Sequence, residues 1–514
     1  MKKWYSFLEV LSFPLKLLFM AVLFYGLGNI LVNDVFSSLF VVKNEYIILI
    51  AEALMRISSF FIVYFPFLFL IRLVAKRING ANSILTGLVG YVTFLVFLIF
   101  FQEQGLANFA YSATLGISVT SSKLSALSGA TRYPLQTGLI GVVIVAICTR
   151  LSLRHSKSRL ENGFLSFIDK NLYGVLLNIL YCGIAGVIVA WTWPYLFRVY
   201  TDIVNFIASD TTNPVNLAVY GIMDRVFAVL NLSNLIRQPF WFRSLGGSIM
   251  NMVGESVAGD VNIWTSVIRT GGVSAQAGKF ITPYYVLNVF AIPGMILAMH
   301  TLNTDKLERR KYRTFIILAI IVSMFSGCLL PLEILLLLLC PLLFVFHVLY
   351  TAGLFGLFQI LGVYLGFQAR SNNVLVEAPG TILELISYSQ LNSLRDDVMV
   401  VCIVGLISFV AYFILTRLYF NVLAYDLFNT GKTDSVAKEM VDALGGSANI
   451  KMIYSSCTHI TVQLFDPSLL NVRGVQVLGA NKLLETRAGF LIDFGAGSRI
   501  MAKAMNKVLR KSMR

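Results

Sequence analysis

Ionisable side chains that interrupt long apolar runs are the first candidates for chemistry in this sequence. Glu333 lies in Pro331–Leu339, a run made almost entirely of leucine, and His347 follows fourteen residues later. Arg225 lies between apolar neighbours in Val215–Leu232. Charged groups at membrane depth cost about 2.5–3.5 kcal/mol, so they usually face a cavity or a partner. We therefore predict that Glu333, Arg225 and His347 belong to a substrate or gating site.

Each of these residues also has a purely structural explanation. Arg225 and Asp224 could form an ion pair at the end of a helix. Glu333 could cap a broken helix, and His347 could be a core histidine whose hydrogen bonds are satisfied. The sequence leaves both explanations open for all three positions.

Prolines break the apolar segment that carries Glu333. Pro331 and Pro341 interrupt what would otherwise be one continuous helix. Broken helices at membrane depth are tolerated where they line a cavity, and they often mark a transporter's binding site. We therefore predict a re-entrant hairpin over Gly327–His347. The interrupted segment Asn288–Gly294 is a second candidate wall of the site, with Asn288 as its polar residue.

The elements that position these residues are membrane helices. The chain has 514 residues, of which 57% are hydrophobic and 13% charged, and its mean hydropathy is +0.77. Soluble domains carry roughly 25% charged residues. Runs long enough to span ~30 Å of hydrocarbon recur, and they predict about ten crossings. Examples are Phe13–Leu31, Tyr46–Leu73, Ile84–Phe101, Leu172–Val199, Phe315–Pro331, Leu332–Phe367 and Val398–Leu415, and several of these are too long for one span and are expected to be split.

Charge placement predicts the orientation of the chain. Net charge is +15, and basic residues cluster at Lys76–Arg77, Arg150–Arg159, Lys306–Arg313 and after Arg499. Basic loops stay on the cytoplasmic side, so both termini are predicted to face the cytoplasm of a bacterial inner membrane. Topology and anionic membrane lipid account for the basic excess, and no nucleic-acid-binding motif is present. The cysteines and histidines show no metal-ligand spacing, so no metal or cofactor is predicted.

The composition changes near residue 430. Residues 1–428 form the predicted membrane domain, 429–438 a polar linker, and 439–514 a small cytoplasmic domain. In that last domain a helix is predicted over Ser435–Leu444 and a basic amphipathic helix over Gly495–Arg510. Strand-like alternation marks two further segments, which are His459–Phe465 and Gly489–Phe494. The predicted fold is α+β, a small antiparallel sheet with helices on one face.

Several stretches resemble one known family. Gly327–His347 resembles the signature of membrane enzyme IIC of the bacterial sugar phosphotransferase system (PTS), closest to the glucose and α-glucoside superfamily. Tyr220–Phe242, Phe290–His300 and Leu85–Tyr91 resemble further segments of the same family. Ala443–Ile450 resembles the opening of the fused enzyme IIB domain. The resemblance covers nearly the whole chain in the family's domain order.

The resemblance implies a function and a set of partners. Family members take up a sugar, here of glucose or α-glucoside type, and phosphorylate it on the cytoplasmic side. The phosphoryl group comes from a cysteine of enzyme IIB, which a soluble enzyme IIA charges. The family also implies a homodimer of about ten helices with re-entrant hairpins. The matched segments add Ser233, Asn234 and His300 to the sugar-binding candidates.

The sequence departs from the family at decisive positions. Leu330 replaces one of two glutamates, and Ser233–Asn234 replaces a pair of histidines. Without gaps, the phosphorylated cysteine of the family aligns with Ser456, and Cys457 lies one residue later. Arginines that would hold the phosphate are replaced by His459 and Thr461.

Two explanations of the acceptor region remain open. A shift of one residue could let Cys457 accept the phosphoryl group, with His459 assisting, although such a shift reverses a side chain's direction in a strand. Alternatively, the enzyme IIB domain is degenerate and carries no phosphate. Three functions follow: a transporter that phosphorylates its sugar, a non-phosphorylating transporter or sugar sensor, and a receptor or scaffold without a sugar site.

Overall fold

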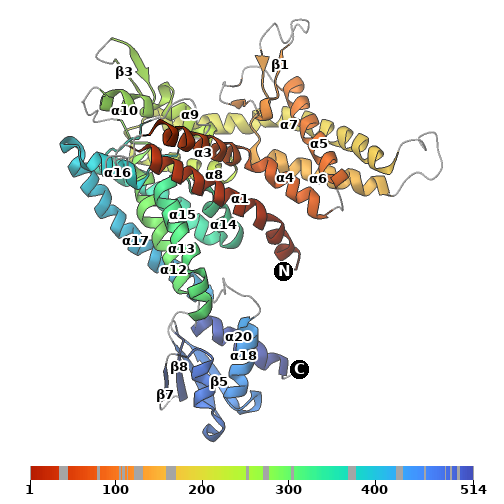
Figure 1. Ribbon diagram of the computed structural model, residues 1–514, viewed down its shortest axis with the longest axis vertical. Coiled ribbons are helices and arrows are strands. Elements are labelled where there is room, and N and C mark those ends of the chain that lie inside the picture. The colour runs from red at the N-terminus through yellow and green to blue at the C-terminus, as the bar shows by residue number, and fades with distance from the viewer. Residues whose placement is uncertain are drawn as a thin grey trace. The chain divides into compact units, whose positions relative to one another are not determined.

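Helices make up most of the described part of the protein in this computed structural model (Figure 1). The structure describes residues 2–33, 44–77, 81–102, 106, 110–112, 114–120, 131–157, 169–250, 254–269, 277–302, 306–368, 378–423, 432–456, 459–480, 482–486, 489–494 and 498–512. Within these residues, eight helical segments are long and apolar enough to cross a membrane. They are α1 (Lys2–Val32), α3 (Glu45–Val63), α5 (Ala81–Phe101), α6 (Gly138–Lys157), α7 (Lys170–Ser209), the segment Thr282–Thr301, α15 (Pro341–Leu361) and α17 (Arg395–Leu423). The predicted class, a polytopic helical membrane protein, is confirmed.

Within the described chain, three further helices carry shorter apolar segments: Phe65–Ala75 of α4 (Phe65–Arg77), Tyr312–Ser326 of α13 (Lys306–Ser326) and the whole of α14 (Leu330–Leu339). Additional helices are α8 (Pro214–Val229), α9 (Ser233–Trp241), α10 (Asp260–Arg269) and α16 (Ile382–Ser389). Helices α11 (Thr282–Val286) and α12 (Ile292–Thr301) form the two ends of the segment Thr282–Thr301. Two small antiparallel hairpins pair β1 (Val119–Thr120) with β2 (Thr131–Arg132), and β3 (Ser248–Met250) with β4 (Ser256–Ala258). The sequence analysis did not predict either hairpin.

Prolines mark two of the helix breaks, because proline lacks an N–H and is best tolerated in the first turn of a helix. The predicted run Tyr46–Leu73 divides at Tyr64, and Pro66 lies in the first turn of α4. The predicted hairpin Gly327–His347 needs a correction. Helix α14 ends before Cys340, but α15 starts at Pro341 and continues to Leu361 as a full span. His347 therefore lies in a helix that is long and apolar enough to cross a membrane, and not in a short re-entrant element.

The chain forms two compact units, one of residues 1–285 and 325–401, the other of 286–324 and 402–514. In the first unit, α5 and α7 pack closely because small residues let their backbones approach. A Cβ at Gly90 would collide with Asn178 of α7. The Asn178 amide in turn donates a hydrogen bond to the Thr86 carbonyl at 2.7 Å.

A second group of helices in the first unit contains α8, α9, α14 and α15. Helix α8 packs along α15, with Gly221 close to Ala352 and Phe355. Two side chains at the start of α8 favour its first turn: Asn213 accepts the Val215 N–H at 2.9 Å, and Pro214 occupies the first helical position. These helices carry the ionisable residues described below.

The second unit contains the interruption predicted at Asn288–Gly294. A single π-helical turn spans Leu287–Ala291, between α11 and α12. The carbonyl of Asn288 in this turn accepts a hydrogen bond from the Ser323 hydroxyl of α13 at 2.7 Å. Such π-turns are rare and are frequently found at functional sites.

The C-terminal part of the second unit is an α+β fold. Four antiparallel strands lie in the order β5-β6-β8-β7. They are β5 (Ile450–Ser455), β6 (His459–Leu464), β7 (Lys482–Thr486) and β8 (Gly489–Asp493). The helices are α18 (Lys432–Ala443), α19 (Val472–Val477) and α20 (Ser498–Ser512). Side chains of α18 and α20, including Met440 and Met505, share one apolar core with Ile460, Val462 and Ile492 of the sheet.

The elements of this region lie close to their predicted positions, with two differences. Helix α18 starts at Lys432, inside the predicted linker 429–438, so part of that linker is helical. Strands β5 and β7 were not predicted as strands. The segment KLLET of β7 lies at one edge of the sheet and alternates weakly, because edge strands commonly carry exposed charged residues.

Candidate functional site

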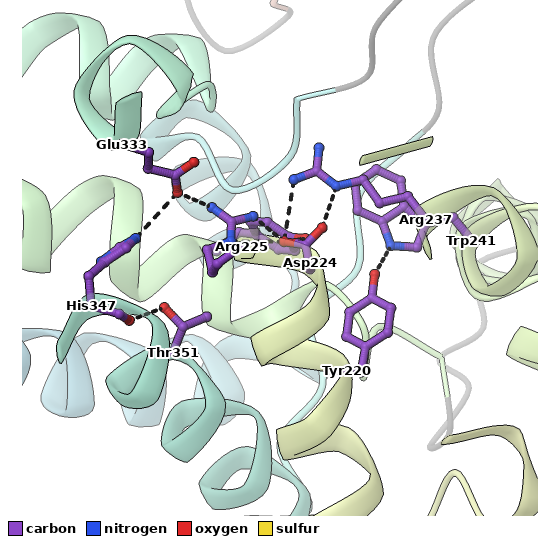
Figure 2. Close-up of polar contacts among 9 residues, drawn as sticks. Tyr220, Asp224, Arg225, Arg237, Trp241, Glu333, His347 and Thr351 are labelled. Atoms are coloured by element: carbon purple, nitrogen blue, oxygen red, sulfur yellow. Dashed lines mark hydrogen bonds and ion pairs between the residues drawn. The ribbon is translucent and has the colours of Figure 1, made fainter. Parts of the chain in front are cut away.

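The ionisable residues of α8 and α14 meet in one buried cluster (Figure 2). Arg225 Nη1 donates to Glu333 Oε1 at 2.6 Å. Arg225 Nε donates to Asp224 Oδ2 at 2.9 Å, and Arg225 Nη2 also contacts this oxygen. The side chains of Arg225 and Glu333 are 2% and 1% exposed. Arg225 and Glu333, which were predicted separately as site residues, therefore contact each other in one cluster.

His347 extends this cluster from α15. Its Nε2 lies 3.3 Å from Glu333 Oε1, and its backbone carbonyl accepts a hydrogen bond from the Thr351 hydroxyl at 2.8 Å. Glu333 also lies in the first turn of α14, where the helix dipole favours a negative charge. His347 thus helps to fix the carboxylate rather than lining the cavity itself.

Arg237 of α9 is a member of the cluster that the sequence analysis missed. Its Nε donates to Asp224 Oδ1 at 2.6 Å, and the Tyr284 hydroxyl donates to Asp224 Oδ2 at 2.7 Å. The guanidinium lies 5.0 Å from the ring centre of Trp241 and 5.4 Å from that of Tyr284. A basic residue directly after the apolar pair Leu235–Ile236 of α9 was the available signal.

The pairing of these groups explains how so much charge is buried. Removing one partner of a buried ion pair typically costs 3–5 kcal/mol, because an uncompensated charge remains. Asp224 is fully buried and faces two guanidinium groups, while Glu333 faces Arg225. Asp224, which we considered only as a helix-end partner of Arg225, is the centre of the cluster.

A turn with an unusual backbone brings α8 and α9 together. Asn231, between the two helices, has a φ of +57°, a left-handed conformation that only glycine, asparagine and aspartate adopt readily. Its side-chain amide donates to the Val63 carbonyl at 2.8 Å. The turn joins α8, which carries Asp224 and Arg225, to α9, which carries Arg237.

A cavity of about 120 Å³ adjoins the cluster. Arg225, Arg237 and Glu333 contribute to its wall, as do Cys328 and Leu330. Its remaining wall includes hydroxyl and amide side chains, namely Ser112, Thr114, Gln136, Thr137, Asn231, Ser233 and Asn234. Polar groups that converge on a pocket fix the orientation of a ligand. Four of the predicted substrate-binding residues, Arg225, Glu333, Ser233 and Asn234, therefore line one cavity.

Of the other three predicted substrate residues, His347 contacts Glu333 without lining the cavity, and two belong to the second unit. Asn288 is buried in the π-turn, and His300 lies in the last turn of α12. Their roles remain predictions.

A different arrangement occurs between β5 and β6 in the second unit. Ser456 Oγ lies 2.9 Å from His459 Nδ1 and accepts the His459 backbone N–H at 3.1 Å. The Ser456 N–H donates to the His459 carbonyl at 2.8 Å. The Ser456 hydroxyl also lies 3.3 Å from the His459 carbonyl, so it can donate either to that oxygen or to Nδ1, depending on the histidine tautomer. Cys457, the other predicted acceptor, lies outside the described residues.

Comparison with known families identifies the membrane region. The family model "Phosphotransferase system, EIIC" matches residues 9–352. The chain therefore belongs to this family, the membrane component of PTS sugar transporters. It is a multi-pass membrane protein whose substrate is a sugar. Arg225, Glu333 and His347 lie within the matched residues, and Ser456 lies outside them.

Proposed function

We propose that the cavity beside Glu333 binds a hexose or glucoside during transport. The observation that carries this proposal is the state of the Glu333 carboxylate. Oε1 is held by Arg225 and His347, whereas Oε2 receives no hydrogen bond from any residue that the structure describes. A fixed carboxylate with one uncommitted oxygen is a suitable acceptor for sugar hydroxyl groups.

The neighbouring polar residues support the same assignment. Ser233 and Asn234, at the start of α9, offer a hydroxyl and an amide to the cavity. Both groups donate and accept hydrogen bonds, as sugar recognition requires. If the bound sugar is phosphorylated, Glu333 can also accept the proton of the attacked hydroxyl.

Sugar-dependent thermal stabilisation of the purified full-length protein tests the proposal. We expect one or more hexoses or glucosides to raise the unfolding temperature of the wild type. Glu333→Gln, which keeps the shape of the side chain, should abolish this increase, and Glu45→Gln, at an exposed position in α3, should not. Stabilisation that persists in Glu333→Gln would disprove the assignment of the site.

We propose that Ser456 is the phosphoryl acceptor of an enzyme IIB-like C-terminal domain. A soluble enzyme IIA would supply the phosphoryl group. As Ser456 Oγ forms its bond to phosphorus, the bond between phosphorus and the donor protein breaks, and the hydroxyl proton passes to His459 Nδ1. The 2.9 Å contact between these atoms supports this step. Cys457 is the second candidate acceptor.

A non-phosphorylating transporter or sugar sensor is the alternative. It is favoured by the position of Ser456 Oγ, which already accepts the His459 N–H within the turn, and by the absence of arginines at positions 459 and 461. Intact-mass measurement after incubation with the soluble phosphotransfer proteins separates the two. Phosphorylation of the wild type that is lost in Ser456→Ala supports our proposal. Phosphorylation that is lost only in Cys457→Ala identifies the cysteine as the acceptor. Absence of phosphorylation in the wild type favours the alternative.

The quaternary structure and orientation are part of the same proposal. We expect a homodimer in the membrane and both termini in the cytoplasm, because the basic clusters mark the cytoplasmic side. Mass photometry in detergent tests the dimer. Labelling of an epitope on each terminus, before and after membrane permeabilisation, tests the orientation.

A further inference from the structure

Arg237 is held rigidly at the wall of the cavity. Asp224 accepts hydrogen bonds from its Nε at 2.6 Å and its Nη2 at 3.4 Å. The rings of Trp241 and Tyr284 lie against the guanidinium. An arginine fixed in this way loses little conformational entropy when it binds a ligand.

One edge of this guanidinium remains uncommitted. Arg237 Nη1 makes no hydrogen bond with any residue that the structure describes, and Figure 2 shows it directed away from Asp224. By contrast, every guanidinium nitrogen of Arg225 contacts Asp224 or Glu333. The side chain of Arg237 is also 16% exposed, compared with 2% for Arg225. Arg237, unlike Arg225, therefore has N–H groups available to bind a ligand in the cavity.

The positions of the charged residues around the cavity favour an acidic ligand group at the Nη1 edge of Arg237. Asp224, which balances Arg237, is fully buried and does not line the cavity. Glu333 has its own partner in Arg225. Leu330 adds no charge to the wall. A ligand in the cavity consequently meets the Arg237 edge before it meets Asp224.

We propose that the transported sugar carries a carboxylate and that Arg237 binds it. Arginine binds carboxylate and phosphate oxygens through paired donors. Asp224 and Glu333 already balance the charges of the two arginines, so the outer edge of Arg237 offers hydrogen-bond donors but no surplus positive charge, which fits a singly charged carboxylate better than a phosphate dianion. The sugar class is thus a hexuronate or another hexose with an acid substituent, whose hydroxyls reach Glu333. This inference rests on the proposed function, because it places the sugar in the same cavity.

Matched pairs of ligands test the inference. The affinities of glucose and glucuronate, galactose and galacturonate, and mannose and mannuronate are measured on the purified full-length protein. A charged hydrogen bond contributes roughly 10- to 100-fold in affinity. We expect the acid of at least one pair to bind at least ~10-fold more tightly than its neutral partner.

Variants then assign this preference to Arg237. Arg237→Gln should remove the preference for the acid, and Arg237→Lys, which keeps the charge but loses the paired donors, should retain part of it. Arg243→Gln, an exposed arginine that does not line the cavity, is the control and should retain all of it. Retention of the preference in a folded Arg237→Gln protein would overturn the role of Arg237.

The wild-type ligand pairs also decide the inference if Arg237→Gln fails to fold. Neutral sugars that bind as tightly as their acids, and lose binding in Glu333→Gln, would overturn the acidic substrate but uphold the proposed function. Absence of binding by every neutral and acidic sugar would overturn both.

Discussion

The charged cluster of α8, α9 and α14 and the turn between β5 and β6 are two very different candidate sites. In the cluster, Arg225 and Glu333 are 108 residues apart and almost completely buried. In the turn, Ser456 and His459 are three residues apart and only part-buried. A site assembled by tertiary packing also stabilises the fold, whereas a site formed within one turn contributes little to it. Substitutions in the two regions should therefore have different consequences.

Asp224→Asn should have the largest effect, because it removes the charge that balances two guanidinium groups. We expect a loss of about 3–5 kcal/mol in the free energy of unfolding, as for other broken buried ion pairs, together with loss of sugar binding. Unfolding of the purified protein in detergent measures this. Asp396→Asn, at an exposed position, is the control. Equal stability of Asp224→Asn and wild type would show that the cluster does not stabilise the fold.

Substitutions of Asn231 should have an intermediate effect. Asn231→Ala loses the hydrogen bond to the Val63 carbonyl and keeps the positive φ, at a combined cost of about 2 kcal/mol. Asn231→Gly also loses the hydrogen bond, but glycine adopts this backbone without strain, so its cost should be about 1 kcal/mol or less. The same unfolding measurement compares the two. A glycine variant less stable than the alanine variant would contradict the importance of the backbone conformation.

Gly446→Ala tests the backbone of the C-terminal region without touching either site. Gly446 has a φ of +89°, and a Cβ there would meet no atom within 4 Å. The cost should come from the backbone alone, about 1 kcal/mol. Gly353→Ala, in the helical interior of α15 and with equally open space, is the matched control and should not destabilise. Equal destabilisation by both variants would show that the positive φ of Gly446 does not account for the cost.

Ser456→Ala should have the smallest effect on stability. Its hydroxyl bonds lie within one part-buried turn, so the free energy of unfolding should change by no more than about 1 kcal/mol. Phosphorylation, in contrast, should be lost completely. The free energy of unfolding and the phosphorylation, detected by intact mass, are measured on the same preparation. A Ser456→Ala protein that unfolds like Asp224→Asn would remove the contrast between the regions.

The sequence predicted the membrane class and several residues of the site, but not their arrangement. Glu333 and Arg225 were recognisable because each interrupts an apolar run. Their mutual contact depends on how α8 packs beside α14, and no local pattern encodes that packing. Arg237 was missed because its role depends on the left-handed turn at Asn231, which places α9 beside Asp224.

The acceptor turn was easier to anticipate, since its partners are neighbours in the chain. Its position at the start of β6 followed from the alternating pattern of His459–Phe465. The hydrogen bond between Ser456 and His459 did not follow, because it depends on the conformation of the turn. Likewise, the break predicted at Pro341 exists, but the helix that starts there continues to Leu361 and is long enough to cross a membrane, which the proline pattern alone did not indicate.

Protection of Cys328 from alkylation tests the central claim, that sugar occupies this cavity, most directly. Cys328 is a native thiol on the cavity wall, and Cys402 of α17 is a similarly part-buried control in the second unit. Using a sugar that stabilises the wild type, we predict that alkylation of Cys328 by a small maleimide slows by at least ~10-fold at saturation, while the rate at Cys402 does not change. An unchanged rate at Cys328 with the sugar bound would contradict the account.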